Sequence, residues 1–173
     1  VANLTGPYVD LAVGGTNIIG QSYSYDGGKS WTSWRTILDL DGTREPCEPF
    51  IIRSPNRKQM MMLLRENNHA FTSWMMLSND EGENWTSPVR IGAEVTFDRH
   101  IAKYLPDGRL IVVGRDVAQM SPAHQHLSAW VGTYEDLLNG KPGQYRIKIF
   151  HSYHGSVEYP GIEILDDGTI VVV

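Results

Sequence analysis

Arginine and carboxylate side chains stand next to each other at three places in the sequence. Arg65-Glu66 and Arg115-Asp116 follow apolar runs, and Asp98-Arg99-His100 leads into another. A guanidinium group binds a carboxylate through two parallel hydrogen bonds, so arginines that converge on one site could hold an acidic ligand. The neighbouring acids could hold the arginines in place. Each pair can also be a simple ion pair at the rim of a sheet, which contributes little to stability.

Two further groups could carry chemistry. Glu158-Tyr159 could be a carboxylate that activates a phenolate, although a tyrosine that opens a strand is more often a packing residue and adjacent strand residues point to opposite faces. His124 and His126 would lie on one side of a strand, as metal ligands do, but the sequence offers no third ligand at zinc spacing. We therefore favour a solvated loop for the histidines and predict no metal site.

An internal repeat must position these residues. Three segments align without gaps and end at Asp26, Asp80 and Asp136, so the repeat period is about 55 residues. A period of this size in a sequence rich in short apolar runs and turn residues predicts a solenoid or a propeller.

Two of the repeats close with the same signature, Ser-x-Asp-x-Gly-x-x-Trp. Aspartate and serine side chains hydrogen-bond the backbone of a tight turn, glycine adopts a positive φ, and the tryptophan can pack over the hairpin. Turn chemistry accounts for every fixed position, so we predict a structural and not a catalytic role. The residues concerned are Ser24, Asp26, Gly28, Trp31, Ser78, Asp80, Gly82 and Trp85.

Hairpins recur in the same phase, at residues 48–65, 100–115 and 159–173. With the other segments they define a four-stranded antiparallel unit, the blade of a β-propeller. About thirteen strands are expected, with one helical turn within residues 135–143 and a buried strand at Met60–Met62. Loops alternate between the two ends of such a unit, which places the short turns at one end and the charged residues at the other.

The two signatures, the blade length and the arginine after the second strand resemble the sialidase (neuraminidase) superfamily, whose propellers carry such Asp-box (BNR) repeats. Bacterial exo-sialidase-like proteins are the nearest match. The resemblance covers nearly the whole chain and implies a six-bladed propeller. Residues 1–173 are therefore expected to be a partial, all-β propeller of about three blades, and a fragment of a longer protein.

The resemblance also implies a function. Sialidases are retaining glycoside hydrolases that hold the sugar carboxylate with three arginines and use a tyrosine nucleophile, polarised by glutamate, with a carboxylic acid as acid/base. The family's usual N-terminal arginine motif, Phe/Tyr-Arg-x-Pro, is absent here. By this resemblance the candidate substrate-binding residues are Arg65, Arg99, His100 and Arg115, and the candidate catalytic residues are Asp98, Asp116, Glu158 and Tyr159.

Two other functions remain open at this point. The chain could belong to a glycan-binding or scaffold propeller without catalysis, because the Asp box marks a fold and not an activity. It could also belong to a lyase or another hydrolase that acts on acidic sugars. An intact acid/base carboxylate and tyrosine nucleophile would separate the hydrolase from the binding protein.

Composition limits the remaining possibilities. The net charge of −5 makes nucleic acid an unexpected partner, and no apolar run approaches the roughly 18 residues of a membrane span. The single cysteine, Cys47, excludes an internal disulfide. We expect a glycan partner, no cofactor, self-association through open sheet edges, and secretion or a periplasmic location if the family resemblance holds.

Overall fold

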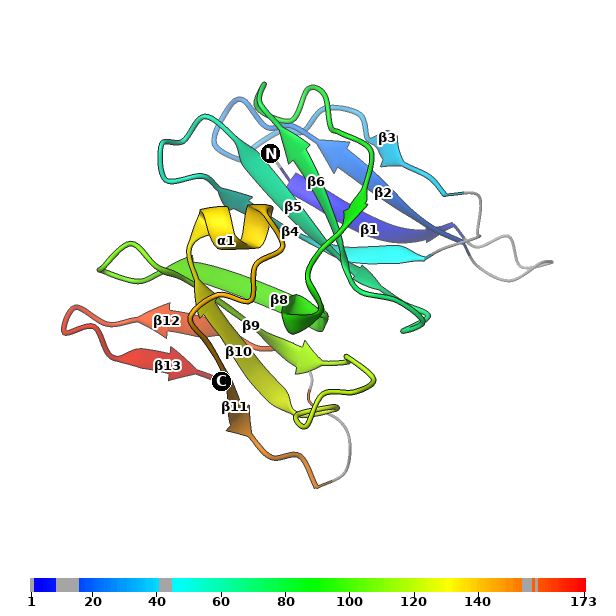
Figure 1. Cartoon of the computed structure of the whole chain (residues 1–173). Helices are drawn as coiled ribbons and strands as arrows, with labels where there is room; N and C mark the ends of the chain where they lie inside the picture. The colour runs from blue at the N-terminus through cyan, green and yellow to red at the C-terminus, as the bar shows by residue number, and fades with distance from the viewer. Residues whose placement is uncertain (1, 9–15, 41–44, 154–156, 158) are drawn as a thin grey trace. The chain divides into compact units, whose positions relative to one another are not determined.

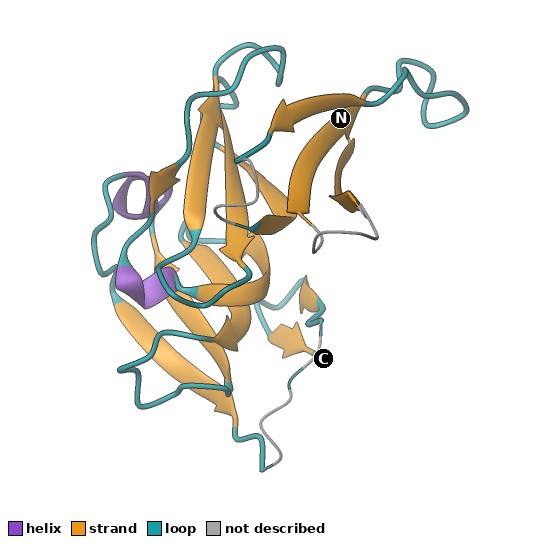
Figure 2. Ribbon diagram, turned by 90° about the vertical axis from the view of Figure 1, so that its right-hand side faces the viewer, coloured by secondary structure: helices purple, strands orange, loops and turns teal. Residues whose placement is uncertain are grey.

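The computed structural model of the chain describes residues 2–8, 16–40, 45–153, 157 and 159–173. It is all-β, as the sequence predicts, with thirteen strands in the described part (Figures 1 and 2). The described helices are α1 (Tyr134–Leu138) and the 3-10 turn η1 (Ala93–Val95). None of the helices described could cross a membrane. The chain forms two compact units, unit 1 (residues 1–68 and 74–88) and unit 2 (residues 69–73 and 89–173).

The first two sheets are built from consecutive antiparallel strands. One has the order β1-β2-β3 and the next has the order β4-β5-β6-β7. Their strands are β1 (Ala2–Tyr8), β2 (Thr16–Ser22), β3 (Arg35–Leu38), β4 (Pro46–Arg53), β5 (Met60–Glu66), β6 (Trp74–Ser78) and β7 (Val89–Arg90).

The core of unit 1 contains apolar side chains from β2, β3, β5 and β6. Ile19, Leu38, Met62 and Trp74 are buried together there, and Trp85 packs against them from the turn after β6. The Met60–Met62 run is buried along its whole length, which confirms the predicted strand.

Unit 2 contains a four-stranded antiparallel sheet with the order β11-β10-β9-β8 and a separate hairpin, β12-β13. Val113, Leu127 and Ala129 of the sheet share a core with Ile162 of the hairpin. The strands are β8 (Phe97–Tyr104), β9 (Leu110–Asp116), β10 (Leu127–Gly132), β11 (Tyr145–Phe150), β12 (Ile162–Ile164) and β13 (Ile170–Val172).

Helix α1 occupies the place of a third Asp turn, as the longer predicted loop suggested. Thr133 caps its N-terminus and accepts a hydrogen bond from the Asp136 backbone, while the Asp136 carboxylate accepts one from the Thr133 backbone. This reciprocal pair is a capping box, so the third repeated aspartate starts a helix and does not close a hairpin.

The turns at residues 24–31 and 78–85, here called the first and second Asp turns, share most of their hydrogen bonds. The Asp26 carboxylate accepts from Ser24 Oγ and from the backbone of Lys29 and Ser30, and Ser24 Oγ accepts from the backbone of Gly28. Ser30 Oγ also donates to the Asp26 carboxylate, at 2.6 Å. This bond and the one from the Ser30 backbone are the main reasons that the pKa of Asp26 is lowered to about 2.

The second Asp turn repeats this arrangement with Ser78, Asp80, Gly82 and Asn84. The tryptophans of the two turns differ, however. Trp85 is partly buried and its Nε1 donates to Gln21 at 2.8 Å, whereas Trp31 is 51% exposed. The expected packing of a tryptophan over its hairpin is therefore much weaker in the first turn.

A β-bulge with a left-handed residue interrupts both β4 and β8. Cys47 pairs with Arg65 and Phe50 with Leu63, so β4 holds one extra residue, and Glu48 there has a φ of 50°. Strand β8 has the same irregularity between Asp98 and Ile101, where Arg99 has a φ of 55°. Bulges bend a strand and redirect its side chains. The sequence did not predict them, since neither residue is glycine.

Candidate functional site

Asp98, Arg115 and Asp116 lie at one end of the β8–β11 sheet. The register places Asp98 opposite Arg115, and Arg115 opposite Leu127. Arg109 lies at the other end of the sheet, in the short turn before β9. The charged loops and the short turns are thus at opposite ends of this sheet, as the alternation of loops predicts.

Asp98 is one of two fully buried carboxylates among the described residues at this end. Its side chain is fully buried and accepts a hydrogen bond from Arg115 Nη2 at 2.5 Å. His69 Nε2 lies 3.1 Å from Asp98 Oδ1 and 3.0 Å from Oδ2. A buried carboxylate needs such partners, because an unpaired charge in the interior is very costly. Asp98 therefore fixes the position of a guanidinium group and an imidazole at once.

Asp116 forms a second, similar centre. It is fully buried, forms an ion pair with Arg146 of β11, and accepts hydrogen bonds from Ser121 Oγ at 2.5 Å and the Ala118 backbone at 3.0 Å. The acid next to Arg115 in the sequence thus holds Arg146, and Arg115 is held by Asp98 from across the sheet. Both aspartates fix cations in place and turn no carboxyl oxygen toward solvent.

Three aromatic side chains contact one another near Asp116. The ring of His126 lies 4.1 Å from that of His151, which lies 4.9 Å from that of Tyr153. Burial, with His151 and Lys148 nearby, lowers the pKa of His126. The backbone N–H of Ser152 donates to His126 Nδ1 at 3.2 Å, which requires that nitrogen to be unprotonated.

Arg99 and His100 follow Asp98 on the bulge of β8. The Arg99 guanidinium lies 4.6 Å from the centre of the Tyr159 ring and donates to the Val157 carbonyl at 3.1 Å. Tyr159 itself is 67% exposed. His100 is buried, with Nδ1 at 3.1 Å from the Phe97 carbonyl oxygen. Glu158 lies outside the described residues.

Arg65 belongs to unit 1, at the end of β5. Its Nη1 donates to Glu48 at 2.9 Å, and both side chains are largely buried. Both Asp turns lie at the opposite end of that unit, because Met60 pairs with Ser78 and Gln21 of β2 donates to the Gly82 carbonyl. The predicted joint binding of one carboxylate by Arg65, Arg99 and Arg115 remains a prediction.

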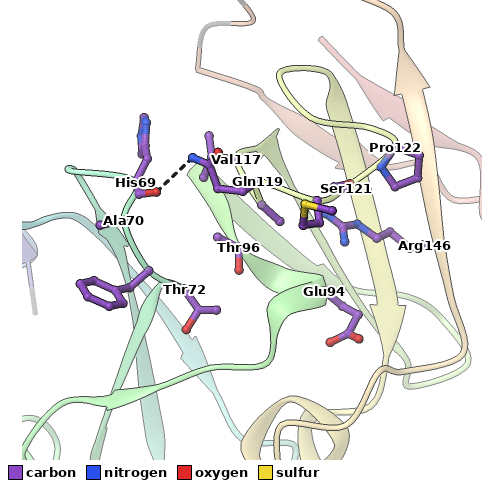
Figure 3. A pocket seen from close by; sticks show the side chains of 13 residues that line it. His69, Ala70, Thr72, Glu94, Thr96, Val117, Gln119, Ser121, Pro122 and Arg146 are labelled. Atoms are coloured by element: carbon purple, nitrogen blue, oxygen red, sulfur yellow. Dashed lines mark hydrogen bonds between the residues drawn. The ribbon is translucent and has the colours of Figure 1, made fainter.

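A cavity of about 440 Å³ opens in unit 2 near the two aspartate centres (Figure 3). The segment 69–73 forms one side, held by a hydrogen bond from Gln119 to the His69 carbonyl at 3.3 Å and one from Arg90 to the Thr72 carbonyl at 2.5 Å. Thr96, Ser121 and Arg146 also line it.

Sequence reasoning missed His69 and Arg146. Neither residue stands at one of the repeated positions where an arginine precedes an acid. Arg146 alternates with apolar residues in β11, a strand whose other side chains are exposed. The one available signal was the position of His69 at the end of the Arg65 loop, equivalent to His126 after the Arg115 loop. In the part of the chain that the structure describes, no three His, Cys, Asp or Glu side chains come together as metal ligands.

Comparisons with known proteins place the chain by its fold. No protein-family model matches it, and no curated protein sequence is similar to it. A protein of unknown function from Dyadobacter fermentans has a solved structure with a TM-score of 0.60 and 16% identity, over 79% of this chain and 35% of that chain. An intramolecular trans-sialidase from Ruminococcus gnavus gives a TM-score of 0.48 and 18% identity, over 78% of this chain and 27% of that one. This chain therefore shares its fold with the Dyadobacter protein and spans about a third of that protein's length.

Proposed function

We propose that this chain is part of a six-bladed, sialidase-like β-propeller that hydrolyses glycans carrying an acidic sugar. Two features of the sequence support this, the repeat of about 55 residues and the paired Asp-turn signatures. Four-stranded antiparallel sheets that follow one another along the chain are consistent with consecutive blades. We also propose that further blades lie in a longer natural protein.

One observation carries the functional part of the proposal. At the loop-rich end of the β8–β11 sheet, two fully buried aspartates each hold an arginine, Arg115 at Asp98 and Arg146 at Asp116. A guanidinium group fixed by a buried carboxylate loses little side-chain entropy when it binds a ligand, so Arg115, held by Asp98, is preorganised for an acidic sugar. Asp98 and Asp116 then act as positioning residues, and Tyr159 with Glu158 remains the candidate nucleophilic pair.

The test is hydrolysis of α-sialosides by the complete natural protein, followed by NMR of the first sugar anomer released. Substituting Arg115→Lys keeps the charge and loses the planar fork, so turnover should fall by about a hundredfold or more. Arg109→Lys is the matched control, since Arg109 pairs with Asp107 at the other end of the sheet. Equal turnover in both variants would remove Arg115 from the site.

A glycan-binding propeller without catalysis is the second candidate. It is favoured by the burial of Asp98 and Asp116, because neither carboxyl group is exposed to exchange a proton with a substrate. Saturable binding of sialosides by the complete protein, without any release of sugar, would favour this candidate over the hydrolase.

A further inference from the structure

We infer that the cavity of unit 2 binds a neutral, hydroxyl-rich sugar unit. This inference rests on the proposed function only in taking the ligand to be part of a glycan. The cavity volume, about 440 Å³, is within the range of small-ligand pockets. Most of the accessible surface of its lining is apolar, and polar side chains interrupt it, which is the usual composition of a ligand site.

The apolar wall includes Phe71, Val117, Met120 and Pro122. The Phe71 ring is 60% exposed, and the Arg90 guanidinium lies 4.4 Å from its centre. This cation–π contact fixes a large aromatic surface that would otherwise rotate freely in solvent. A fixed aromatic face suits the apolar C–H face of a sugar ring, which cannot hydrogen-bond.

The polar groups are unusual because two of them are buried and unused. Thr96 is only 4% exposed, and its Oγ1 has no hydrogen-bond partner among the described residues. Arg146 Nε is also buried without a hydrogen-bond partner in the described part, while Nη2 of the same guanidinium forms an ion pair with Asp116. Buried polar groups are nearly always satisfied, so two orphans in the wall of one cavity point to a ligand that supplies the missing partners. Both atoms have almost no accessible surface, so the two side chains must shift slightly when the ligand binds.

The charge of the cavity decides which ligand fits. Asp116 neutralises Arg146, so the carboxylate of Glu94 leaves the lining with a net negative charge. A carboxylate ligand would be repelled by Glu94, whereas a hydroxyl can donate to Glu94 and accept from Arg146 Nε. Figure 3 shows these side chains around the cavity, with Glu94 on η1, Thr96 just before β8 and Arg146 on β11. A neutral sugar satisfies all three groups.

The experiment measures direct binding of methyl glycosides of galactose, glucose and mannose to the complete protein, by saturation-transfer NMR, with glucuronic acid as the acidic competitor. At least one neutral glycoside should bind saturably and glucuronic acid should not. Thr96→Val keeps the shape and removes the hydroxyl, so it should weaken binding about tenfold or more. Thr36→Val, at an exposed position on β3, is the control and should change nothing.

Two further variants keep the test decisive if Thr96→Val unfolds the protein. Phe71→Ala and Glu94→Gln alter accessible side chains of the lining and should each weaken binding while the thermal unfolding curve stays unchanged. The inference is overturned if no neutral glycoside binds, if glucuronic acid binds more tightly, or if binding survives in all three lining variants. These readouts need neither an acidic sugar nor hydrolysis, so their failure is separate from a failure of the sialoside assay.

Discussion

Replacing Asp98 by asparagine should destabilise the protein far more than the same change in an exposed ion pair. Asp98 is fully buried, and Arg115 beside it is 12% exposed at the side chain. Asparagine keeps the shape and one acceptor oxygen but removes the charge that faces both Arg115 and His69. Removing one partner of a buried ion pair costs about 3–5 kcal/mol, because the other charge stays uncompensated in the interior.

The matched control is Asp107→Asn. Asp107 also pairs with an arginine, Arg109, but these side chains are 51% and 29% exposed, and water replaces a lost partner there. Urea unfolding of the complete protein, followed by tryptophan fluorescence, should show a large fall in the midpoint for Asp98→Asn and none beyond error for Asp107→Asn. Adding Arg115→Met to Asp98→Asn should recover part of the loss, since it removes the uncompensated cation.

A cost below about 1 kcal/mol for Asp98→Asn, the level of an exposed pair, would show that Asp98 does not hold a buried charge in place. A double variant less stable than Asp98→Asn alone would show that the penalty comes from lost packing and not from an unpaired charge.

Two more predictions concern stability. Trp85→Ala should lower the free energy of unfolding in urea by about 3 kcal/mol, since Trp85 packs on the core of unit 1 and donates to buried Gln21. Trp31→Ala should lower it by less than about 1 kcal/mol, and equal losses would contradict the different packing of the two turns. Burial lowers the pKa of His126 in the folded protein. Unfolded chains therefore bind a proton on this imidazole near pH 6.5, while the folded protein does not. The free energy of unfolding should be at its full value above that pH and should decline as the pH falls toward the lower pKa of the folded state. The urea midpoint between pH 7.5 and 5 should therefore fall less steeply in His126→Gln, and parallel curves would refute this.

The strands and turns were predictable from the sequence because the repeat fixes their phase. The Ser, Asp and Gly positions of both Asp turns carry their own turn chemistry, and the apolar run at Met60 has no helical spacing. Local residue types were therefore sufficient to predict the count and order of the strands.

The partners within the site were not predictable in the same way. Arg115 stands next to Asp116 in the sequence but is held by Asp98, because adjacent strand residues point to opposite faces and the partner comes from across the sheet. The bulge sets which residue of β8 lies opposite Arg115. No glycine marks that bulge, so its position depends on packing between strands.

The bulge in β8 also determines where the chain can change in length. Side chains along a strand alternate between the two faces of the sheet. Inserting or deleting one residue between Phe97 and Ile101 would therefore turn each side chain on one side of that point to the opposite face of the sheet. The buried carboxylate of Asp98 and the buried ring of Phe97 would then trade places. Gly114 adds to this constraint, because a side chain there would come within 2.8 Å of the Asp98 carbonyl oxygen. In descendants of this sequence, this short stretch should therefore keep its number of residues even where its residue types drift.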